Sequence, residues 1–205
     1  MYERRHRESL RQDARSAVEW LYHLSHVDEP SVLDALSRLM EPAIAVRDPL
    51  AESVLHELEP LLTSPRARAN VALYRSMIAM AKGEWARAAE LLAHLEGSPH
   101  LTAAQRNHAS QFEALALRYM GELERAIVVA ERYVAAKVND PDRRSLAANL
   151  TNLAELYGLR GQLTMAESRL HESLAVLGDA GDPLERMKAL LYLDHCYRWQ
   201  GRWTK

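Results

Sequence analysis

The sequence lacks the residues that mark several large classes of protein. Among its 205 residues there is one cysteine, Cys196, so neither an internal disulfide nor a multi-cysteine metal site can form. No run approaches the roughly 18 consecutive apolar residues that a membrane-spanning helix needs. The charged N-terminus also has no apolar core typical of a secretory leader. We therefore expect a cytoplasmic protein with no membrane contact and no cofactor.

The sequence has no excess of positive charge. Lys and Arg number 26 against 28 Asp and Glu, which gives a formal net charge of −2. A sequence-independent grip on nucleic-acid phosphates depends on a basic surface. We therefore expect no direct nucleic-acid binding. An RNA-binding helical repeat is kept only as a second alternative.

The composition and the patterns indicate long helices around a continuous core. Hydrophobic residues make up 48% of the chain, which excludes a disordered protein. The eight glycines and eight prolines mostly fall in short clusters, as expected for helices joined by brief turns. Alternation typical of strands is nowhere sustained.

One pattern recurs four times at nearly constant spacing. Glycines stand at intervals of 38, 40 and 40 residues, and each is followed two residues later by a large apolar residue and, in three copies, five residues later by alanine. The members of this signature are Gly83, Trp85 and Ala88; Gly121, Leu123 and Ala126; Gly161, Leu163 and Ala166; and Gly201 and Trp203. Apolar and small residues before each glycine, at spacings of three and four, predict a helix that ends there.

This pattern predicts pairs of antiparallel helices. Two helices that reverse direction within a few residues need a permissive backbone at the turn, which glycine supplies. The small residues let the helix axes approach, and the large residue after the turn fills the space between the helices. One such pair cannot bury its own apolar face, so neighbouring pairs must stack.

The signature resembles the tetratricopeptide repeat (TPR), in which a small residue in the first helix precedes Gly-x-aromatic-x-x-Ala at the turn. The resemblance implies an all-α fold, a right-handed superhelix (solenoid) of stacked antiparallel helix pairs. It covers residues 66–205 as units of about 66–99, 100–139, 140–181 and an incomplete 182–205. The units are longer than that family's usual 34 residues.

Residues 1–65 have helical patterns without the glycine signature. We expect helices at about 8–25, 32–46 and 50–63, with Ser31 and Asp48-Pro49 as start signals. Further starts are expected at Asp140-Pro141 and Asp182-Pro183, and at a capping box of Thr102 with Gln105. Residues 1–65 are interpreted as degenerate repeats or a capping region.

A second, looser resemblance concerns the stretch 58–65 leading into Gly83-Glu84-Trp85. It is similar to the helical arrays of large bacterial transcription activators of the maltose-regulator type. The resemblance implies a sensor or scaffold segment of a bacterial regulatory protein. No glycine-rich loop ending in Lys-Ser or Lys-Thr is present, so we expect no nucleotide-binding ATPase domain in this chain.

The sequence ends soon after the fourth glycine, before a second helix of that unit. Two hypotheses follow. Either the array continues in a longer protein, or another molecule covers the last helix, which allows a homo-oligomer through the terminal repeat.

The first helices of such pairs line the concave surface of a solenoid, where extended ligands dock. We expect twelve outward-facing residues on them to contact a partner: Asn70, Tyr74, Met77, His108, Gln111, Phe112, Thr151, Asn152, Glu155, Lys188, Tyr192 and His195. The leading hypothesis is a non-enzymatic module that binds a protein or peptide. The alternative is a regulatory domain that binds a small-molecule effector in a pocket between helices.

No pattern favours catalysis or metal binding. The nine histidines form no cluster with zinc-ligand spacing, and no nucleophile motif such as Gly-x-Ser-x-Gly occurs. Cys196 lies in an apolar helix and is interpreted as core. The four tryptophans, Trp20, Trp85, Trp199 and Trp203, are also interpreted as core residues and not as stacking platforms for bases.

Overall fold

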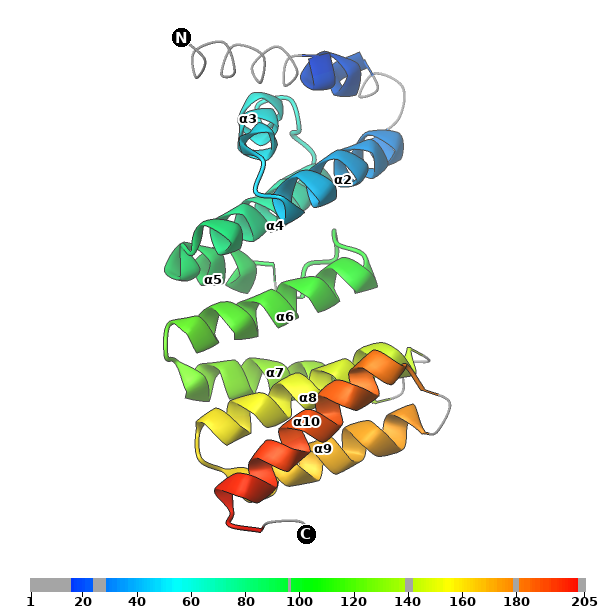
Figure 1. The fold of residues 1–205 in the computed structure, drawn as a ribbon. Helices are drawn as coiled ribbons and strands as arrows, with labels where there is room; N and C mark the ends of the chain where they lie inside the picture. Colours follow the sequence, from blue (N-terminus) through cyan, green and yellow to red (C-terminus); the bar gives the residue numbers. More distant parts are fainter. Residues whose placement is uncertain (1–15, 24–28, 96, 139–141, 179–180, 203–205) are drawn as a thin grey trace. The chain divides into compact units, whose positions relative to one another are not determined.

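The computed structural model describes residues 16–23, 29–95, 97–138, 142–178 and 181–202. Every regular element within these ranges is a helix, and consecutive helices pack in pairs (Figure 1). The chain divides into two compact units, Met1–Phe112 and Glu113–Lys205. The all-α class of stacked antiparallel helix pairs is therefore confirmed, and each unit is described separately.

The first unit contains α2 (Glu29–Ala45), α3 (Pro49–Leu58), α4 (Pro65–Lys82) and α5 (Trp85–Ala93), and α6 (Ala103–Tyr119) begins in it. Residues 16–23 are also helical, and the rest of the helix expected at 8–25 lies outside the described residues. Helices α2 and α3 pack on α4. Their shared core includes Leu36, Met40 and Val54, with Val71 and Tyr74 from α4. Part of residues 1–65, the region interpreted as degenerate repeats or a cap, therefore shares a core with the first expected repeat.

The second unit contains α7 (Leu123–Lys137), α8 (Arg143–Leu159), α9 (Leu163–Leu177) and α10 (Pro183–Trp199). Helix α8 packs on both α7 and α9, and α10 packs on α8 and α9. Leu150, Leu153 and Leu170 are fully buried at the centre of this packing. Burial of large leucines at helix spacing is the main stabilising contribution here, on the order of 2 kcal/mol for each side chain.

The four signature glycines lie at four turns of the same geometry. Each has a positive φ, between 70° and 80°, which glycine adopts without steric cost. At Gly161 the amide donates to the carbonyl of Gly158 (2.9 Å), and the next amide, of Gln162, donates to that of Tyr157 (2.9 Å). The same two bonds recur at the other three glycines. These are Schellman caps, which satisfy the last carbonyls of one helix before the next begins.

The residues after the turns close the helix crossings. Ala88, Ala126 and Ala166 are each 0% exposed, so any larger side chain there would push the paired helices apart. Trp85, Leu123 and Leu163 are half-buried at the start of the second helices. Trp203 lies outside the described residues.

Helix starts follow the expected capping chemistry at some positions and depart from it at others. The Asp48 carboxylate accepts from the Leu50 amide at 2.9 Å, and Asp182 accepts from two amides of α10. The amide of Gln105 donates to Thr102 at 3.2 Å, and its side chain accepts in return at 3.0 Å. The expected start at Ser31 is wrong because α2 already begins at Glu29. The helix expected to start at Asp140-Pro141 begins at Arg143, where Asp142 is the cap.

The prediction that all four tryptophans are core residues is wrong for two of them. Trp20 and Trp199 are both more than half exposed. Trp199 lies in the last turn of α10, three residues after the buried Cys196, and its ring lies beside Gly158 of α8, but most of its surface remains exposed.

Cys196 is buried in α10, as expected for a core residue. Burial raises the pKa of its thiol, and the nearby Glu167 carboxylate adds to this effect. Because the thiolate is the reactive form, we expect Ellman's reagent to label native Cys196 at least about tenfold more slowly than the denatured chain. Equal labelling rates in native buffer and in guanidinium would contradict this packing.

Candidate interaction surface

Three of the twelve residues expected to line an open surface are buried. Asn70, Tyr74 and Thr151 are at most 3% exposed, so the prediction that they face outward is wrong. Each is held by neighbours in the helix packing.

Asn70 and Tyr74 are covered in the first unit. The Asn70 amide donates to the Arg66 carbonyl at 2.9 Å, and its oxygen accepts from Gln105 of α6 at 2.5 Å. Tyr74 belongs to the core shared by α2 and α4. Burial, with a smaller contribution from the charge of Glu41, raises its pKa to about 12. Both side chains therefore stabilise the packing of first helices against their neighbours.

Thr151 faces the second helix of its own pair. Its hydroxyl donates to the Ala147 carbonyl at 3.1 Å and lies 3.0 Å from the Ser173 hydroxyl of α9. Ser173 donates to the same carbonyl at 2.8 Å. Because every buried hydroxyl here has a partner, the group joins α8 to α9 without an unpaired polar atom.

The other residues of the first unit lie at intermediate depth. Met77 packs against the core of α2 and α4. Gln111 and Phe112 are half-buried, and His108 is exposed with its ring centre 6.1 Å from that of Phe112. These contacts leave His108 as the most accessible of the expected residues in this unit.

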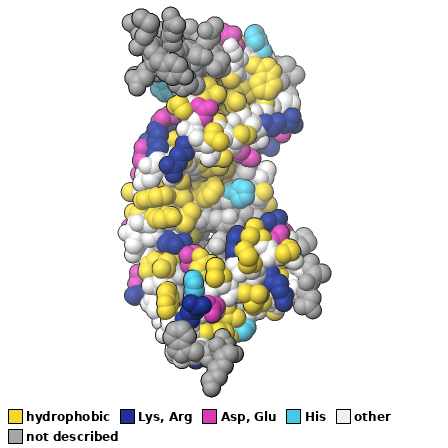
Figure 2. All heavy atoms as spheres, viewed as in Figure 1, with side chains coloured by type: hydrophobic (Ala, Val, Ile, Leu, Met, Phe, Trp, Pro, Cys, Tyr) yellow, Lys and Arg dark blue, Asp and Glu magenta, His cyan; other side chains and the backbone are white. Residues whose placement is uncertain are grey.

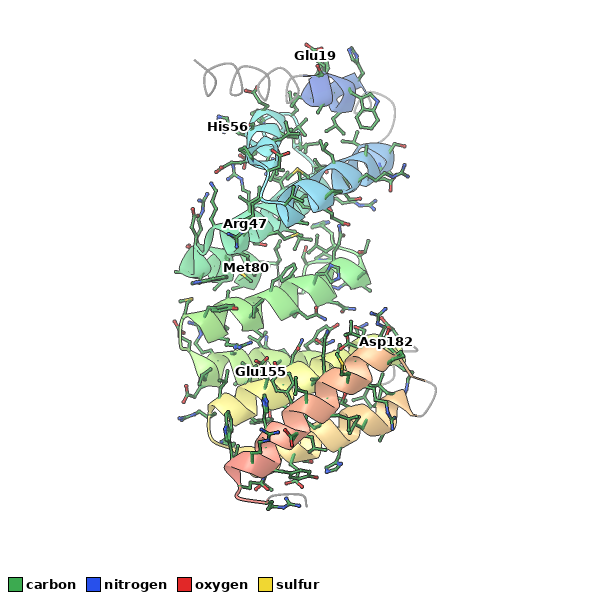
Figure 3. All side chains as sticks on the ribbon, in the orientation of Figure 1. Glu19, Arg47, His56, Met80, Glu155 and Asp182 are labelled. Carbon is green, nitrogen blue, oxygen red and sulfur yellow. The ribbon has the colours of Figure 1, made fainter. Side chains whose placement is uncertain are left out.

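In the second unit, three side chains from successive first helices form a connected polar group. The Arg118 guanidinium of α6 makes two bonds to the Glu155 carboxylate of α8, at 3.0 Å and 2.9 Å. Tyr192 of α10 also bonds to Glu155, and burial, followed by this bond and the Glu155 charge, raises the tyrosine pKa to about 12. Figure 3 labels Glu155 on α8. A two-point Arg–carboxylate pair fixes the orientation of both groups as well as their distance.

Three of the expected residues around this group are exposed, namely Asn152, Lys188 and His195. Asn152 lies three residues before Glu155, and therefore on the same side of α8. On α10, Lys188, Tyr192 and His195 follow at spacings of four and three. The Lys188 ammonium pairs with Glu185 at 3.0 Å, and the rings of Tyr192 and His195 make an edge contact at 6.2 Å. We call this set the polar face: Arg118, Asn152, Glu155, Lys188, Tyr192 and His195.

Sequence reasoning missed Arg118. It lies in the last turn of α6, three residues before the signature glycine. The equivalent positions in the other copies are Met80, Gly158 and Arg198, so the residue type is not constant among the four copies and did not indicate a role. Only its contact with Glu155 in the structure reveals the role of Arg118.

The first unit also contains a hollow of about 430 Å³ between α3, α4 and α5. Its apolar lining comes from Leu55, Ile78 and Ala79. Its polar lining consists of Glu52, Ser53, His56, Arg75 and Arg87. Arg75 pairs with Glu59, and Arg87 pairs with Glu84 at 2.9 Å. The arginine charges at this hollow are therefore already paired within the chain.

Charges of both signs are mixed on the visible surface. Lys and Arg side chains are interspersed with Asp, Glu and hydrophobic side chains on the face shown in Figure 2. Among the residues that the structure describes, no three His, Cys, Asp or Glu side chains are arranged to hold a metal ion. No helix in these ranges is long and apolar enough to span a bilayer.

The fold is that of TPR-like repeat proteins. The structure of BtubC (BKLC) from P. vanneervenii superposes with a TM-score of 0.70 at 17% identity, covering 95% of this chain and 84% of that one. A Podosopora anserina chain described as a putative kinesin light chain with nearly identical TPR-like repeats gives 0.69 at 21% identity, over 86% and 90% of the two chains. A substituted form of that chain gives the same TM-score at 20% identity. No protein-family model and no curated protein matches the sequence.

Proposed function

We propose that the chain is a non-enzymatic module that binds a protein or peptide through the polar face of its second unit. The observation that supports this most directly is the connection of Arg118, Glu155 and Tyr192, which orders the edges of three first helices around exposed hydrogen-bonding groups. TPR-like folds commonly bind proteins on such first-helix surfaces. The expected setting is a cytoplasmic sensor or scaffold segment of a bacterial regulatory protein.

The exposed groups match the needs of an extended peptide. The Asn152 side-chain amide has both a donor and an acceptor, so it can pair with one peptide group of a bound backbone. Lys188 offers two remaining donors beyond its bond to Glu185, and His195 offers an aromatic edge. Because Arg118 and Tyr192 already saturate much of Glu155, we expect them to position the surface and not to contact the peptide.

This assignment predicts which substitution weakens binding. A phage-displayed peptide library is panned on the chain, and the Kd of an enriched synthetic peptide is measured by calorimetry. We expect Asn152→Ala to raise the Kd about tenfold, because the peptide group loses a directional pair of hydrogen bonds. The matched control is Thr164→Ala, an exposed polar residue on α9. Failure to enrich any peptide, or equal affinities for Asn152→Ala and Thr164→Ala, would contradict the proposal.

A second candidate function is binding of a small-molecule effector in the hollow of the first unit. Its volume of about 430 Å³ falls in the range of ligand sites, roughly 300–1,000 Å³. A screen of phosphorylated and carboxylated metabolites by thermal shift tests it. A metabolite that raises the melting temperature of the parent chain but not of Arg75→Ala would favour this candidate. A metabolite that stabilises both equally would count against the hollow.

A further inference from the structure

Three exposed apolar side chains occupy the same position on successive first helices. Tyr119, Leu159 and Trp199 each lie two residues before a signature glycine, and they are 56%, 47% and 63% exposed. They come from α6, α8 and α10, and all three belong to the second unit. The first copy of the repeat has Ala81 here, which packs against the core of the first unit. We call the three exposed residues the apolar ridge.

The apolar ridge adjoins the polar face. Leu159 follows Glu155 by four residues on α8, so both side chains lie on the same side of that helix. The Arg118 guanidinium that bonds to Glu155 also lies 5.7 Å from the ring centre of Tyr119. The ridge and the polar face therefore form one continuous surface, with hydrogen-bonding groups along one side and apolar groups along the other.

The charges beside the ridge are already neutralised within the chain. Every charged residue within three positions of a ridge member has an ion-pair partner. The pairs are Arg118–Glu155, Glu122–Arg125, Arg160–Glu124, Arg198–Asp194 and Arg202–Glu167. A charged group brought onto the ridge would lose water without gaining a free counter-charge. The ridge is therefore complementary to an uncharged segment.

The spacing of the ridge indicates the backbone form of that segment. Helices α8 and α10 pack on each other, and axes of packed helices lie about 8–10 Å apart. A Cβ built on Gly158 would lie 3.8 Å from the Trp199 ring, so this ring lies against α8 beside Leu159. In a polyproline II helix, residues three apart share one side at intervals of about 9.3 Å, which matches. Alternate residues of a β-strand repeat at only about 6.7 Å.

The polar face distinguishes polyproline II from an α-helix as the bound form. Along α8, Glu155 lies about 4.5 Å from Asn152 and about 6 Å from Leu159, measured along the axis. A polyproline II segment lying over Glu155 has three rows of side chains, so one row reaches the ridge while another faces the polar side. Its backbone has no internal hydrogen bonds, which leaves peptide groups for Asn152. The backbone groups of a bound α-helix are already paired with each other.

We propose that the apolar ridge and the polar face together bind an uncharged, proline-rich segment of another protein in the polyproline II conformation. Prolines at every third residue then pack on Tyr119, Leu159 and Trp199. A segment that is already extended loses little conformational entropy on binding, and proline rings pack well on aromatic side chains. This inference rests on the proposed function, because it names the kind of peptide that the same site takes.

The first experiment is an NMR titration of the isotope-labelled chain with a synthetic peptide of three Pro-Gln-Gln units, blocked at both ends. The signal followed is the indole amide of Trp199, which is assigned by its absence from Trp199→Phe. We expect the peptide to shift this signal and to bind at least about tenfold more tightly than its isomer with prolines at positions 1, 3 and 5, which places only one proline on the ridge at a time. No shift at millimolar peptide, or equal binding of the isomer, overturns the inference.

Two variants test the ridge itself. Trp199→Ala is expected to raise the Kd of the Pro-Gln-Gln peptide at least about tenfold, and Leu159→Gln about fivefold. Trp20→Ala is the matched control, because Trp20 is also 55% exposed but lies in the first unit. Equal affinities of Trp199→Ala and Trp20→Ala overturn the inference. A library-selected peptide that Asn152→Ala still weakens would in that case leave the proposed function standing.

Discussion

Replacing Gly161 with valine is expected to lower the free energy of unfolding by about 2–3 kcal/mol. Gly161 has φ +78°, and a Cβ built on it meets no atom within 4 Å. The expected loss is therefore backbone strain in the left-handed region and not a steric clash, and a β-branched residue tolerates that region least. Urea denaturation followed by circular dichroism measures it.

Two controls separate the turn geometry from a general effect of substitution. Gly161→Asn should cost clearly less than Gly161→Val, because asparagine enters the left-handed region more readily. Arg132→Val, at an exposed position of α7, should cost no more than about 0.5 kcal/mol of helix propensity. A larger loss at Arg132 than at Gly161 would contradict the repeat register.

The second large effect on the free energy of unfolding is expected at Leu150, and it is compared with Leu190, the equivalent leucine one repeat later. Leu150→Ala is expected to cost about 3–4 kcal/mol, because Leu150 is 0% exposed on α8, a helix that packs on α7, α9 and α10, and its truncation leaves a cavity. Leu190→Ala should cost less than about 1 kcal/mol, because Leu190 is 47% exposed.

Thermal denaturation at low micromolar concentration compares the two variants. Equal losses would mean that Leu190 is covered in solution. A small loss at Leu150 would mean that α9 does not pack on α8 as described.

The fold was predictable because its strongest constraints are local. A helix that ends in a Schellman cap needs glycine at one position, and repetition of that glycine at 38 and 40 residues predicts repeated helix pairs without knowledge of any contact. The region before residue 66 lacks this marker. Its packing on α4 depends on contacts distant in sequence, such as those of Leu36 and Val54 with the shared core, which periodicity does not reveal.

The candidate site was predicted less well, because an error of one residue in the register of a helix is enough to assign a side chain to the wrong face. Counting from the signature glycines, Asn152 and Tyr192 occupy the same position, nine residues before the glycine, whereas Thr151 is one residue earlier. That single step of about 100° turns Thr151 from the polar face toward α9. The sequence also contains no sign that α2 covers Tyr74, because both sides of that contact are ordinary amphipathic helices.

Hydrogen–deuterium exchange with and without a library-selected peptide tests the central proposal most directly. The polar-face assignment predicts slower amide exchange in α8 and α10, residues 143–159 and 183–199, and no change in residues 49–93 around the hollow. Protection confined to residues 49–93, with α8 and α10 unchanged, would contradict the assignment and place the binding site in the first unit.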